Sequence, residues 1–224
     1  MSDTPDVEGA GSPEPAAYAG RTKYDAARAA RYEARSTRRH AEEWRVVTRL
    51  LAGLPTPRTV LDAPSGTGRI AAEFLARGAH VRLADWSEDM LARARANVRS
   101  STGVLGVSRL DLEAPVEPGA QTHELVICLR FFHHLPDDAR RRLVLASLRA
   151  RSSERVIVSF HHPVSAHHLA RAARRLVTGR KGDRHALTLG ALERLARPLG
   201  LRLERAAAVS PYLRDFWAAA FRID

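Results

Sequence analysis

From residue 57 onward, two kinds of segment alternate along the chain, and they differ in the spacing of their apolar residues. Short apolar runs rich in Val, Leu and Ile are typical of buried strands, whereas segments with apolar residues three and four positions apart are typical of helices. The pattern predicts strands over 58–63, 80–85, 104–112, 123–131, 154–160, 201–209 and 215–222, and helices over 69–78, 87–100, 136–150 and 188–200.

Strands that alternate with helices along the chain indicate an α/β fold with a mostly parallel sheet covered by helices on both faces. The two segments near the C-terminal end, 201–209 and 215–222, are rich in alanine. Periodicity alone allows either helix or strand there, and we interpret both as strands. No internal repeat is visible in the sequence.

The first 56 residues follow a different pattern. Residues 1–20 carry four acidic residues, no basic residue and three prolines, which predicts a disordered acidic tail. Residues 21–56 are rich in Ala, Arg and Glu and predict an N-terminal helical lid of one or two helices. The core domain is then expected over 57–224, with a basic insertion at about 164–185 that holds six basic residues against one acidic residue.

Composition and charge narrow the class of protein. The 224 residues include 36 Lys and Arg against 25 Asp and Glu, a net charge of +11, so an anionic partner is worth considering. The single cysteine, Cys128, excludes a disulfide framework and a multi-cysteine zinc site, and we expect it in the core. Because no apolar run approaches a membrane span and the N-terminus lacks a signal-peptide pattern, we expect a cytoplasmic protein.

The sequence VLDAPSGTGRI, residues 60–70, carries the clearest chemical signal. An apolar strand leads into a turn with Gly66 and Gly68, and a helix begins near Arg69. Such turns let a ligand approach the backbone closely, and residues 66–71 also match the G-x-G-x-x-A pattern of dinucleotide enzymes. Asp62 at the strand end would repel phosphates, and it suits a ligand with an amino or sulfonium cation instead.

Four blocks in this order resemble the class I S-adenosylmethionine-dependent methyltransferases, and more loosely their small-molecule or lipid/quinone-type branch. The blocks are VLDAPSGTGRI, VRLADWSEDML with Asp85, Asp111-Leu112, and HELVICLRFFHHLPDDARRRLVLASL. The chain has Pro64 where the family usually has glycine. The resemblance implies a Rossmann-like three-layer sandwich with a mostly parallel seven-stranded sheet, an antiparallel last strand and an N-terminal helical lid.

The resemblance also implies a cofactor, S-adenosyl-L-methionine, with S-adenosyl-L-homocysteine as the product. Each block would contact one part of the cofactor, and Leu129 and Arg130 would lie on the methyl-donor side. The implied cofactor-binding residues are Asp62, Gly66 and Gly68 at the methionine part, Asp85 at the ribose, Trp86, Met90, Asp111 and Leu112 at the adenine, together with Ala63, Leu129 and the lid residue Tyr24.

Histidine pairs follow two of the predicted strands. His133 and His134 come after the strand over 123–131, and His161 with His162 ends the strand over 154–160. The carboxyl ends of parallel strands form the ligand crevice, so these imidazoles are expected near the substrate. Oxygen nucleophiles need a base, and we take His133 or His134 as the first candidate and His161 as the second. The spacing matches no metal-ligand pattern, so no metal site is predicted.

The expected acceptor is a small or lipid-like molecule, methylated at oxygen. The basic insertion suits either a solvated helix over the crevice or a peripheral contact with an anionic membrane. We do not expect nucleic acid as a partner, because the insertion lacks the interleaved aromatic residues of single-strand binding. The alternatives are an RNA-directed methyltransferase, a nicotinamide-dependent oxidoreductase and a non-catalytic relative. The sequence leaves the oligomeric state open.

Overall fold

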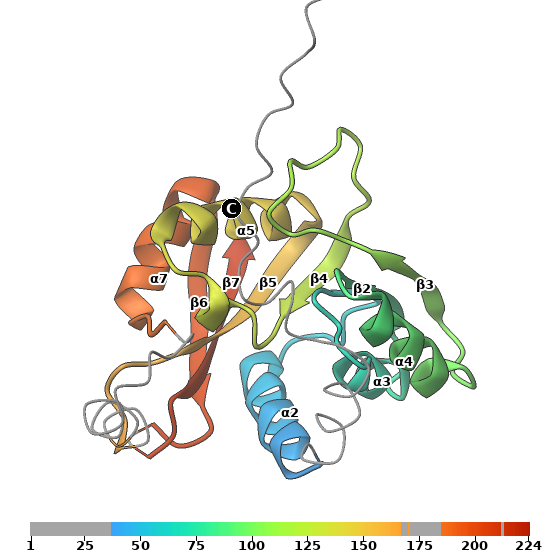
Figure 1. Ribbon diagram of the computed structural model, residues 1–224, viewed down its shortest axis with the longest axis horizontal. Helices are drawn as coiled ribbons and strands as arrows, with labels where there is room; N and C mark the ends of the chain where they lie inside the picture. Colours follow the sequence, from blue (N-terminus) through green and yellow to red (C-terminus); the bar gives the residue numbers. More distant parts are fainter. Residues whose placement is uncertain (1–36, 167–169, 171–184, 212) are drawn as a thin grey trace, which may run out of the picture.

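The computed structural model describes residues 37–166, 170, 185–211 and 213–224 (Figure 1). The expected tail over 1–20, the first part of the lid with Tyr24, and most of the basic insertion lie outside the described residues. The described strands form one seven-stranded sheet. They are β1 (Thr59–Asp62), β2 (His80–Asp85), β3 (Val104–Arg109), β4 (His123–Cys128), β5 (Ser152–His161), β6 (Leu201–Ala208) and β7 (Phe216–Ile223).

The strand order is β3-β2-β1-β4-β5-β7-β6. The first five strands along the chain pair in parallel, whereas β7 runs antiparallel to both β5 and β6. This arrangement confirms the predicted fold class, including the antiparallel last strand. Ala218, Ala219 and Ala220 of β7 are fully buried between the neighbouring layers. Pairing and burial therefore decide that this alanine-rich segment is a strand despite the helix propensity of alanine.

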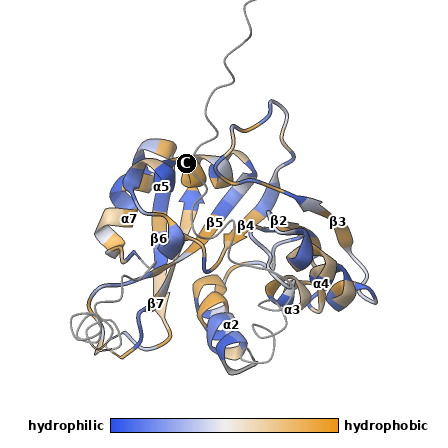
Figure 2. Ribbon diagram, viewed as in Figure 1, coloured by the Kyte–Doolittle hydropathy of each residue, from blue (hydrophilic) through white to orange (hydrophobic). Residues whose placement is uncertain are grey.

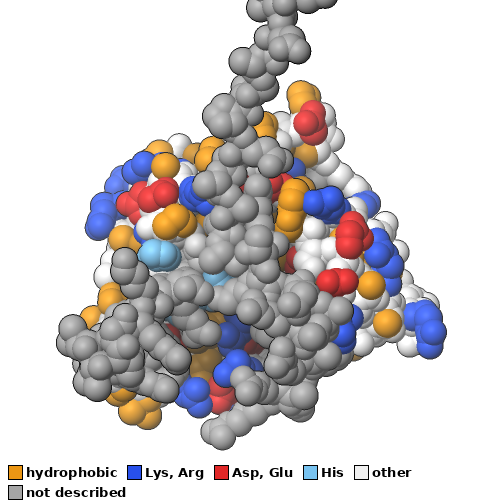
Figure 3. Space-filling view, viewed as in Figure 1, with side chains coloured by type: hydrophobic (Ala, Val, Ile, Leu, Met, Phe, Trp, Pro, Cys, Tyr) orange, Lys and Arg blue, Asp and Glu red, His pale blue; other side chains and the backbone are white. Residues whose placement is uncertain are grey.

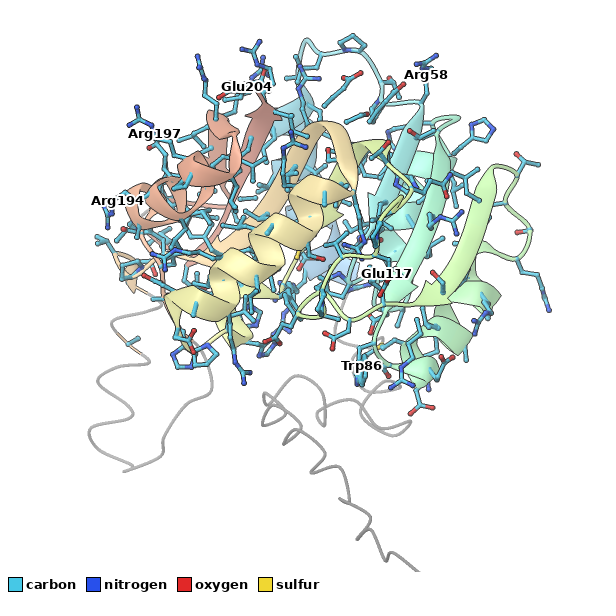
Figure 4. The ribbon with its side chains drawn as sticks, turned by 90° about the horizontal axis from the view of Figure 1, so that it is seen from above. Arg58, Trp86, Glu117, Arg194, Arg197 and Glu204 are labelled. Atoms are coloured by element: carbon cyan, nitrogen blue, oxygen red, sulfur yellow. The ribbon has the colours of Figure 1, made fainter. Side chains whose placement is uncertain are left out.

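Helices cover both faces of the sheet. One face packs against α2 (Thr37–Leu51), α3 (Arg69–Leu75) and α4 (Glu88–Val98), and the other against α5 (Asp138–Ala150) and α7 (Leu189–Ala196). The view from above shows α5 and α7 on one side of the strands and α2 on the other (Figure 4). Two short 3₁₀ helices, η1 (Phe132–His134) and η2 (Arg197–Leu199), complete the described elements.

Two hydrophobic cores lie on opposite faces of the sheet. Leu125 and Ile127 of β4 belong to the core under α2, α3 and α4, whereas Val126 and Cys128 belong to the core under α5 and α7. Successive side chains of a strand point to opposite faces, so a strand covered on both sides is apolar throughout. Cys128 is fully buried, as expected of a core residue.

Helix α2 is the described part of the predicted lid. It is hydrophilic near its start and hydrophobic toward its end (Figure 2). Val46, Val47 and Leu50 are buried in the core that α2 shares with α3 and α4, and the Trp44 ring meets Phe74 edge-on at a centroid distance of 5.1 Å. This helix is thus packed as part of a layer, and a lid function stays a prediction.

Several predicted elements are shorter in the structure than the pattern indicated, among them the helix expected over 69–78, which ends at Leu75. The strands expected over 104–112 and 123–131 end at Arg109 and Cys128, and the helix expected over 188–200 ends at Ala196 and continues as η2. Arg130 has a φ of 56°, which takes the chain out of the sheet after β4. The residues released from the two strands form loops at the carboxyl edge of the sheet.

The carboxyl ends of β1, β2, β4 and β5 lie along the same edge of the sheet, because these strands are parallel. Trp86, just after β2, marks this edge in Figure 4, and Arg58, just before β1, marks the opposite edge. Among the residues that the structure describes, no helix is long and apolar enough to cross a membrane.

Candidate active site

A cleft opens at the edge of the sheet where β1, β2 and β4 end. It encloses about 1010 Å³ of space, counted with its mouth open to solvent. Open α/β sheets bind ligands at this edge, and the cleft reaches the size of pockets for small-molecule cofactors. Nine of the residues that the family resemblance implies line it: Asp62, Ala63, Gly66, Asp85, Trp86, Met90, Asp111, Leu112 and Leu129.

Two glycines shape the turn after β1, and they do so in different ways. Both have left-handed backbones, with φ of 54° at Gly66 and 77° at Gly68. A Cβ atom at Gly68 would lie 3.0 Å from the Leu83 side chain and 3.3 Å from Ala94, so this glycine permits close packing of α3 and does not line the cleft. A Cβ atom at Gly66 would meet nothing within 4 Å, so this glycine leaves space beside the cleft.

Asp62 is a buried carboxyl at the end of β1, with 2% of its surface exposed. Its Oδ2 atom accepts a hydrogen bond from the Ala71 N–H at 3.2 Å, in the first turn of α3. Burial is the main reason that the pKa of Asp62 is raised to about 8, and the negative charge of Asp85 raises it further. The hydrogen bond from Ala71 and the positive charge of Arg69 act in the opposite direction and lower this pKa. A cation in the cleft would therefore favour the ionised form of this carboxyl.

Asp85 ties the end of β2 to the turn after β1. Its two carboxylate oxygens accept hydrogen bonds from the N–H groups of Gly66 at 2.8 Å and Ser87 at 2.9 Å. Burial raises its pKa, and these backbone hydrogen bonds oppose the rise. Each carboxylate oxygen can accept a second hydrogen bond, so the same group can also bind a hydroxyl of a ligand.

The side of the cleft beyond β2 combines an aromatic ring with apolar residues. The Arg109 guanidinium lies 3.9 Å from the centre of the half-buried Trp86 ring, a cation–π contact that holds the indole at the cleft. Met90 and Leu112 are both 4% exposed and supply apolar surface. Asp111 accepts a hydrogen bond from the Glu113 N–H at 3.0 Å, which fixes the carboxylate beside Leu112. These side chains suit a flat ring with polar edges.

The opposite side of the cleft holds an ion pair that joins two distant segments. Arg130 follows β4, and its N–H donates a hydrogen bond to the Ser159 hydroxyl at 2.7 Å. Its Nε–H donates to the carboxylate of Glu43 on α2, which is 3% exposed. The guanidinium also lies over the Phe216 ring, 5.3 Å from its centre. Both members of the pair line the cleft.

The three predicted base candidates come together, but only one reaches the cleft. The His133 ring lies 4.0 Å from the His134 ring and 4.3 Å from the His161 ring, between ring centres. All three are buried, and His134 alone lines the cleft, whereas His133 and His161 lie behind it. Histidine side chains are visible near the middle of the face drawn in Figure 3. Within the described residues, no group of three or more His, Cys, Asp or Glu could hold a metal ion.

Sequence reasoning missed two acidic residues of this region. Glu43 is one of two adjacent glutamates in a charged helical segment, and it lies 87 residues before its partner Arg130. Asp215, 5% exposed, precedes β7 and lies beside His161, with 3.3 Å between Oδ2 and Nδ1. No local pattern distinguishes either residue, because only the pairing of distant segments brings it to the site. Tyr24 lies outside the described residues.

Comparison with known sequences points to one family. Residues 60–152 match the family model described as a methyltransferase domain. The chain is 34% identical over 88 residues to a ubiquinone biosynthesis O-methyltransferase from Hahella chejuensis, covering 39% of this chain and 37% of that protein. A protein of the same name from Nitrosomonas europaea is 27% identical over 93 residues, covering 42% and 39%. The matches thus span about two fifths of these relatives.

Solved structures share the fold over most of the chain. Magnesium protoporphyrin IX methyltransferase from Synechocystis PCC 6803, solved with bound S-adenosylhomocysteine, has a TM-score of 0.67 and 18% identity, covering 84% of this chain and 85% of that one. A TehB-like S-adenosylmethionine-dependent methyltransferase from Corynebacterium glutamicum has a TM-score of 0.62 and 18% identity, covering 89% and 100%.

The sheet order and the cleft at the ends of β1, β2 and β4 are those of a Rossmann-like fold that methyltransferases of known structure share. Residues 60–152 match a methyltransferase domain, and solved S-adenosylmethionine-dependent methyltransferases share the fold, so S-adenosylmethionine is the cofactor that these matches indicate.

The residues of the cleft fit this cofactor. S-adenosylmethionine carries positive charge at its sulfonium and ammonium groups. Asp62, Asp85 and Glu43 present three carboxyls to the cleft. Burial costs the charged forms of Asp62 and Asp85 solvation, and a cationic ligand offsets that cost. The open space at Gly66 lets a ligand lie against the turn backbone.

Proposed function

We propose that the protein transfers the methyl group of S-adenosylmethionine to an oxygen atom of a small or lipid-like acceptor, with His134 as the general base. The observation that carries this proposal is the position of His134. It follows β4 in the 3₁₀ helix η1 and is the one member of the histidine cluster that lines the cofactor cleft. A hydroxyl in the cleft could thus meet an imidazole, the side chain that commonly serves as a general base.

The cofactor would be held from several sides of the cleft. Asp62 and the backbone at Gly66 would bind its methionine part, and Asp85 would accept hydrogen bonds from the ribose hydroxyls. Trp86 would lie against the adenine, with Met90, Asp111 and Leu112 around it, and Ala63 and Leu129 would complete the walls. When bound, the cofactor supplies an electrophilic methyl group. The protein contributes orientation, and the His134 imidazole takes the proton of the acceptor hydroxyl.

Two observations support a small or lipid-like acceptor. The two sequence relatives are named as O-methyltransferases of ubiquinone biosynthesis, and the structural relative from Synechocystis PCC 6803 is named as a methyltransferase of magnesium protoporphyrin IX. The acceptor side of the cleft is also rich in rings, with Phe131 in its lining and Phe216 under Arg130. Flat aromatic acceptors pack well against such surfaces.

The test is methyl transfer from labelled S-adenosylmethionine to a panel of phenols, catechols, amines and RNA. Replacing His134→Ala should lower turnover of a hydroxyl acceptor by about 10²- to 10⁴-fold, because general-base catalysis contributes that much. The affinity for S-adenosylhomocysteine, measured by calorimetry, should change little.

The matched control is His80→Ala, an exposed histidine at the start of β2, at the opposite edge of the sheet. This variant should retain turnover. Normal turnover in the His134 variant would exclude His134 as the base. Methylation of RNA alone, with a steep salt dependence of binding, would replace the small-molecule acceptor by nucleic acid.

A further inference from the structure

A line of ionisable side chains leads from the cleft to a buried carboxylate. His134 lines the cleft, and the His133 ring lies against the His134 ring. The His161 ring stacks on His133 with an angle of 7° between the ring planes. Asp215 lies beside His161 at the far end, with 3.3 Å between Oδ2 and Nδ1. We call these three imidazoles the histidine array.

The sheet builds this line from segments that are far apart in sequence. His161 pairs with Phe216 in the antiparallel register of β5 and β7, which brings Asp215 to the end of β5. The His162 N–H donates to the Asp215 carbonyl at 2.8 Å and holds that backbone in place. The His185 N–H donates to the His133 carbonyl at 2.9 Å. The pairing of β5 with β7 and these two backbone hydrogen bonds therefore hold His133, His161 and Asp215 in place beside one another.

Because the three imidazoles are buried, the protonation of each one depends strongly on the charge of the others. His133 and His161 are each 4% exposed and His134 is 8% exposed, so water screens their charges poorly. Two imidazolium ions about 4 Å apart repel each other, and the array accepts a first proton far more readily than a second. A carboxylate beside His161 attracts that first proton to His161.

Other charged groups of the described residues face this region from each neighbouring element. Arg130 after β4 and Glu43 on α2 form an ion pair, which leaves little net charge toward His134. His162 follows His161, and its ring lies tilted against the Trp217 ring at a centroid distance of 4.9 Å. His185 precedes the bridge between His161 and Ala186. Among the residues that the structure describes, Asp215 is an acidic residue in contact with the array.

We propose that Asp215 is a positioning residue for the proton of the array: it holds a proton on His161 and thereby keeps His134 unprotonated at neutral pH. This inference rests on the proposed role of His134 as a base. An unprotonated His134 can accept the proton of an acceptor hydroxyl, as the O–H bond breaks and an N–H bond forms on the imidazole. The proton then returns to solvent through the mouth of the cleft.

The proposal predicts the direction of a pKa change in Asp215→Asn. Without the carboxylate, His161 loses its preference for the proton, and the repulsion that it exerts on His134 weakens. Asp215 lies two rings away from His134, so losing its direct attraction matters less than losing the nearer imidazolium. The pKa of His134 should rise by about 0.5 to 1 unit. His161→Gln removes the imidazolium but keeps the carboxylate, and it should raise that pKa further.

The experiment is a titration of the histidine side chains by NMR in protein labelled at the imidazoles, with S-adenosylhomocysteine added. The matched control is Asp224→Asn, the same substitution at the other end of β7, where Asp224 pairs with Arg202 at 3.1 Å. This control should leave the His134 pKa unchanged. In a methyl-transfer assay, Asp215→Asn should move the acidic limb of the kcat/KM profile to higher pH by the same amount, with the plateau at high pH retained.

The two readouts separate the inference from the proposed function. An NMR pKa of His134 that stays constant or falls in both Asp215→Asn and His161→Gln would overturn the role of Asp215, whatever the enzyme methylates. A His134 pKa that rises in Asp215→Asn and His161→Gln would support the role of Asp215 in placing the proton. If His134→Ala nevertheless transfers methyl groups at the wild-type rate, His134 is not the general base. If Asp215→Asn fails to fold, His161→Gln alone decides the sign of the change.

Discussion

At the scale of single residues, Asp62 shows how a buried carboxyl in the lining of the cleft can oppose the stability of the fold. The carboxyl is buried at the end of β1, and its pKa of about 8 lies well above the ordinary value of 3.8. The folded protein therefore holds a proton that the unfolded chain releases over this range. A carboxyl with a raised folded pKa contributes stability below its unfolded pKa, and that stability is lost as pH rises toward the folded pKa.

Replacing Asp62→Asn should stabilise the protein relative to the wild type, and the gain should grow with pH. Between about pH 5 and pH 8 the difference in unfolding free energy between the variant and the wild type should increase by about 2–4 kcal/mol. Over this range the carboxyl of Asp62 is ionised in the unfolded wild-type chain but still protonated in the folded protein, so the wild type loses stability as the pH rises. Urea denaturation at the two pH values measures this. The same variant should bind S-adenosylmethionine about ten-fold or more weakly. An equal gain at both pH values would contradict the raised pKa.

At the scale of secondary-structure elements, one ion pair connects the helix before the core domain to the centre of the site. Glu43 on α2 and Arg130 after β4 are joined by a hydrogen bond, and both line the cleft. The Glu43 side chain is 4% exposed and that of Arg130 is 24% exposed. Removing one member of such a pair leaves the other with an uncompensated charge in a poorly hydrated place.

Glu43→Gln should lower the unfolding free energy by about 1–3 kcal/mol, less than for a fully buried pair because water partly reaches Arg130. The matched control is the neighbouring Glu42→Gln, whose carboxylate lies 3.6 Å from the Arg214 guanidinium in a more exposed pair. The control should cost under about 1 kcal/mol. Thermal or urea denaturation of both variants, with Arg130→Gln to complete a double-mutant cycle, measures the coupling. Equal losses in both variants would show that the pair adds nothing specific.

At the scale of the whole molecule, the net charge of +11 comes mainly from arginine. Only two of the 36 basic residues, Lys23 and Lys181, are lysines. Arginine keeps its charge at all pH values of interest and binds phosphate groups in a bidentate manner. A genome rich in G and C also favours arginine, so charge alone does not name the partner. The segment over 164–185 concentrates six basic residues with an apolar stripe, which suits the surface of an anionic membrane.

We predict that the protein binds vesicles containing phosphatidylglycerol and that added salt weakens this binding, because the attraction is electrostatic. Vesicles of phosphatidylcholine alone should bind poorly. Replacing Arg174→Gln together with Arg175→Gln should reduce binding by about thirty-fold, at roughly 1 kcal/mol for each arginine. The control pair, Arg197→Gln with Arg202→Gln, lies on exposed positions of η2 and β6 and should matter less. An equal loss of vesicle binding in the two double variants would show that the net charge of the protein, and not the segment over 164–185, determines the binding.

Most of the fold could be predicted from local patterns, and part of the site could not. The strands around Asp62 and Asp85 begin and end close to the predicted positions, since apolar runs and the glycine turn act locally. The strand expected over 123–131 stops at Cys128, because the left-handed backbone of Arg130 turns the chain away. Neither Glu43 nor Asp215 carries a local signal, and each reaches the site only through the packing of distant segments.

The sequence by itself determined the α/β order of the elements and the glycine turn with its carboxyl ligand candidates, because hydrophobic period and turn chemistry depend on neighbouring residues. The tertiary structure decided which groups meet. Parallel strands bring the ends of β1, β2, β4 and β5 to one edge, so that His134 enters the cleft while His133 and His161 lie behind it. Antiparallel pairing of β5 with β7 places Asp215 beside His161, a neighbour that no spacing along the chain could indicate.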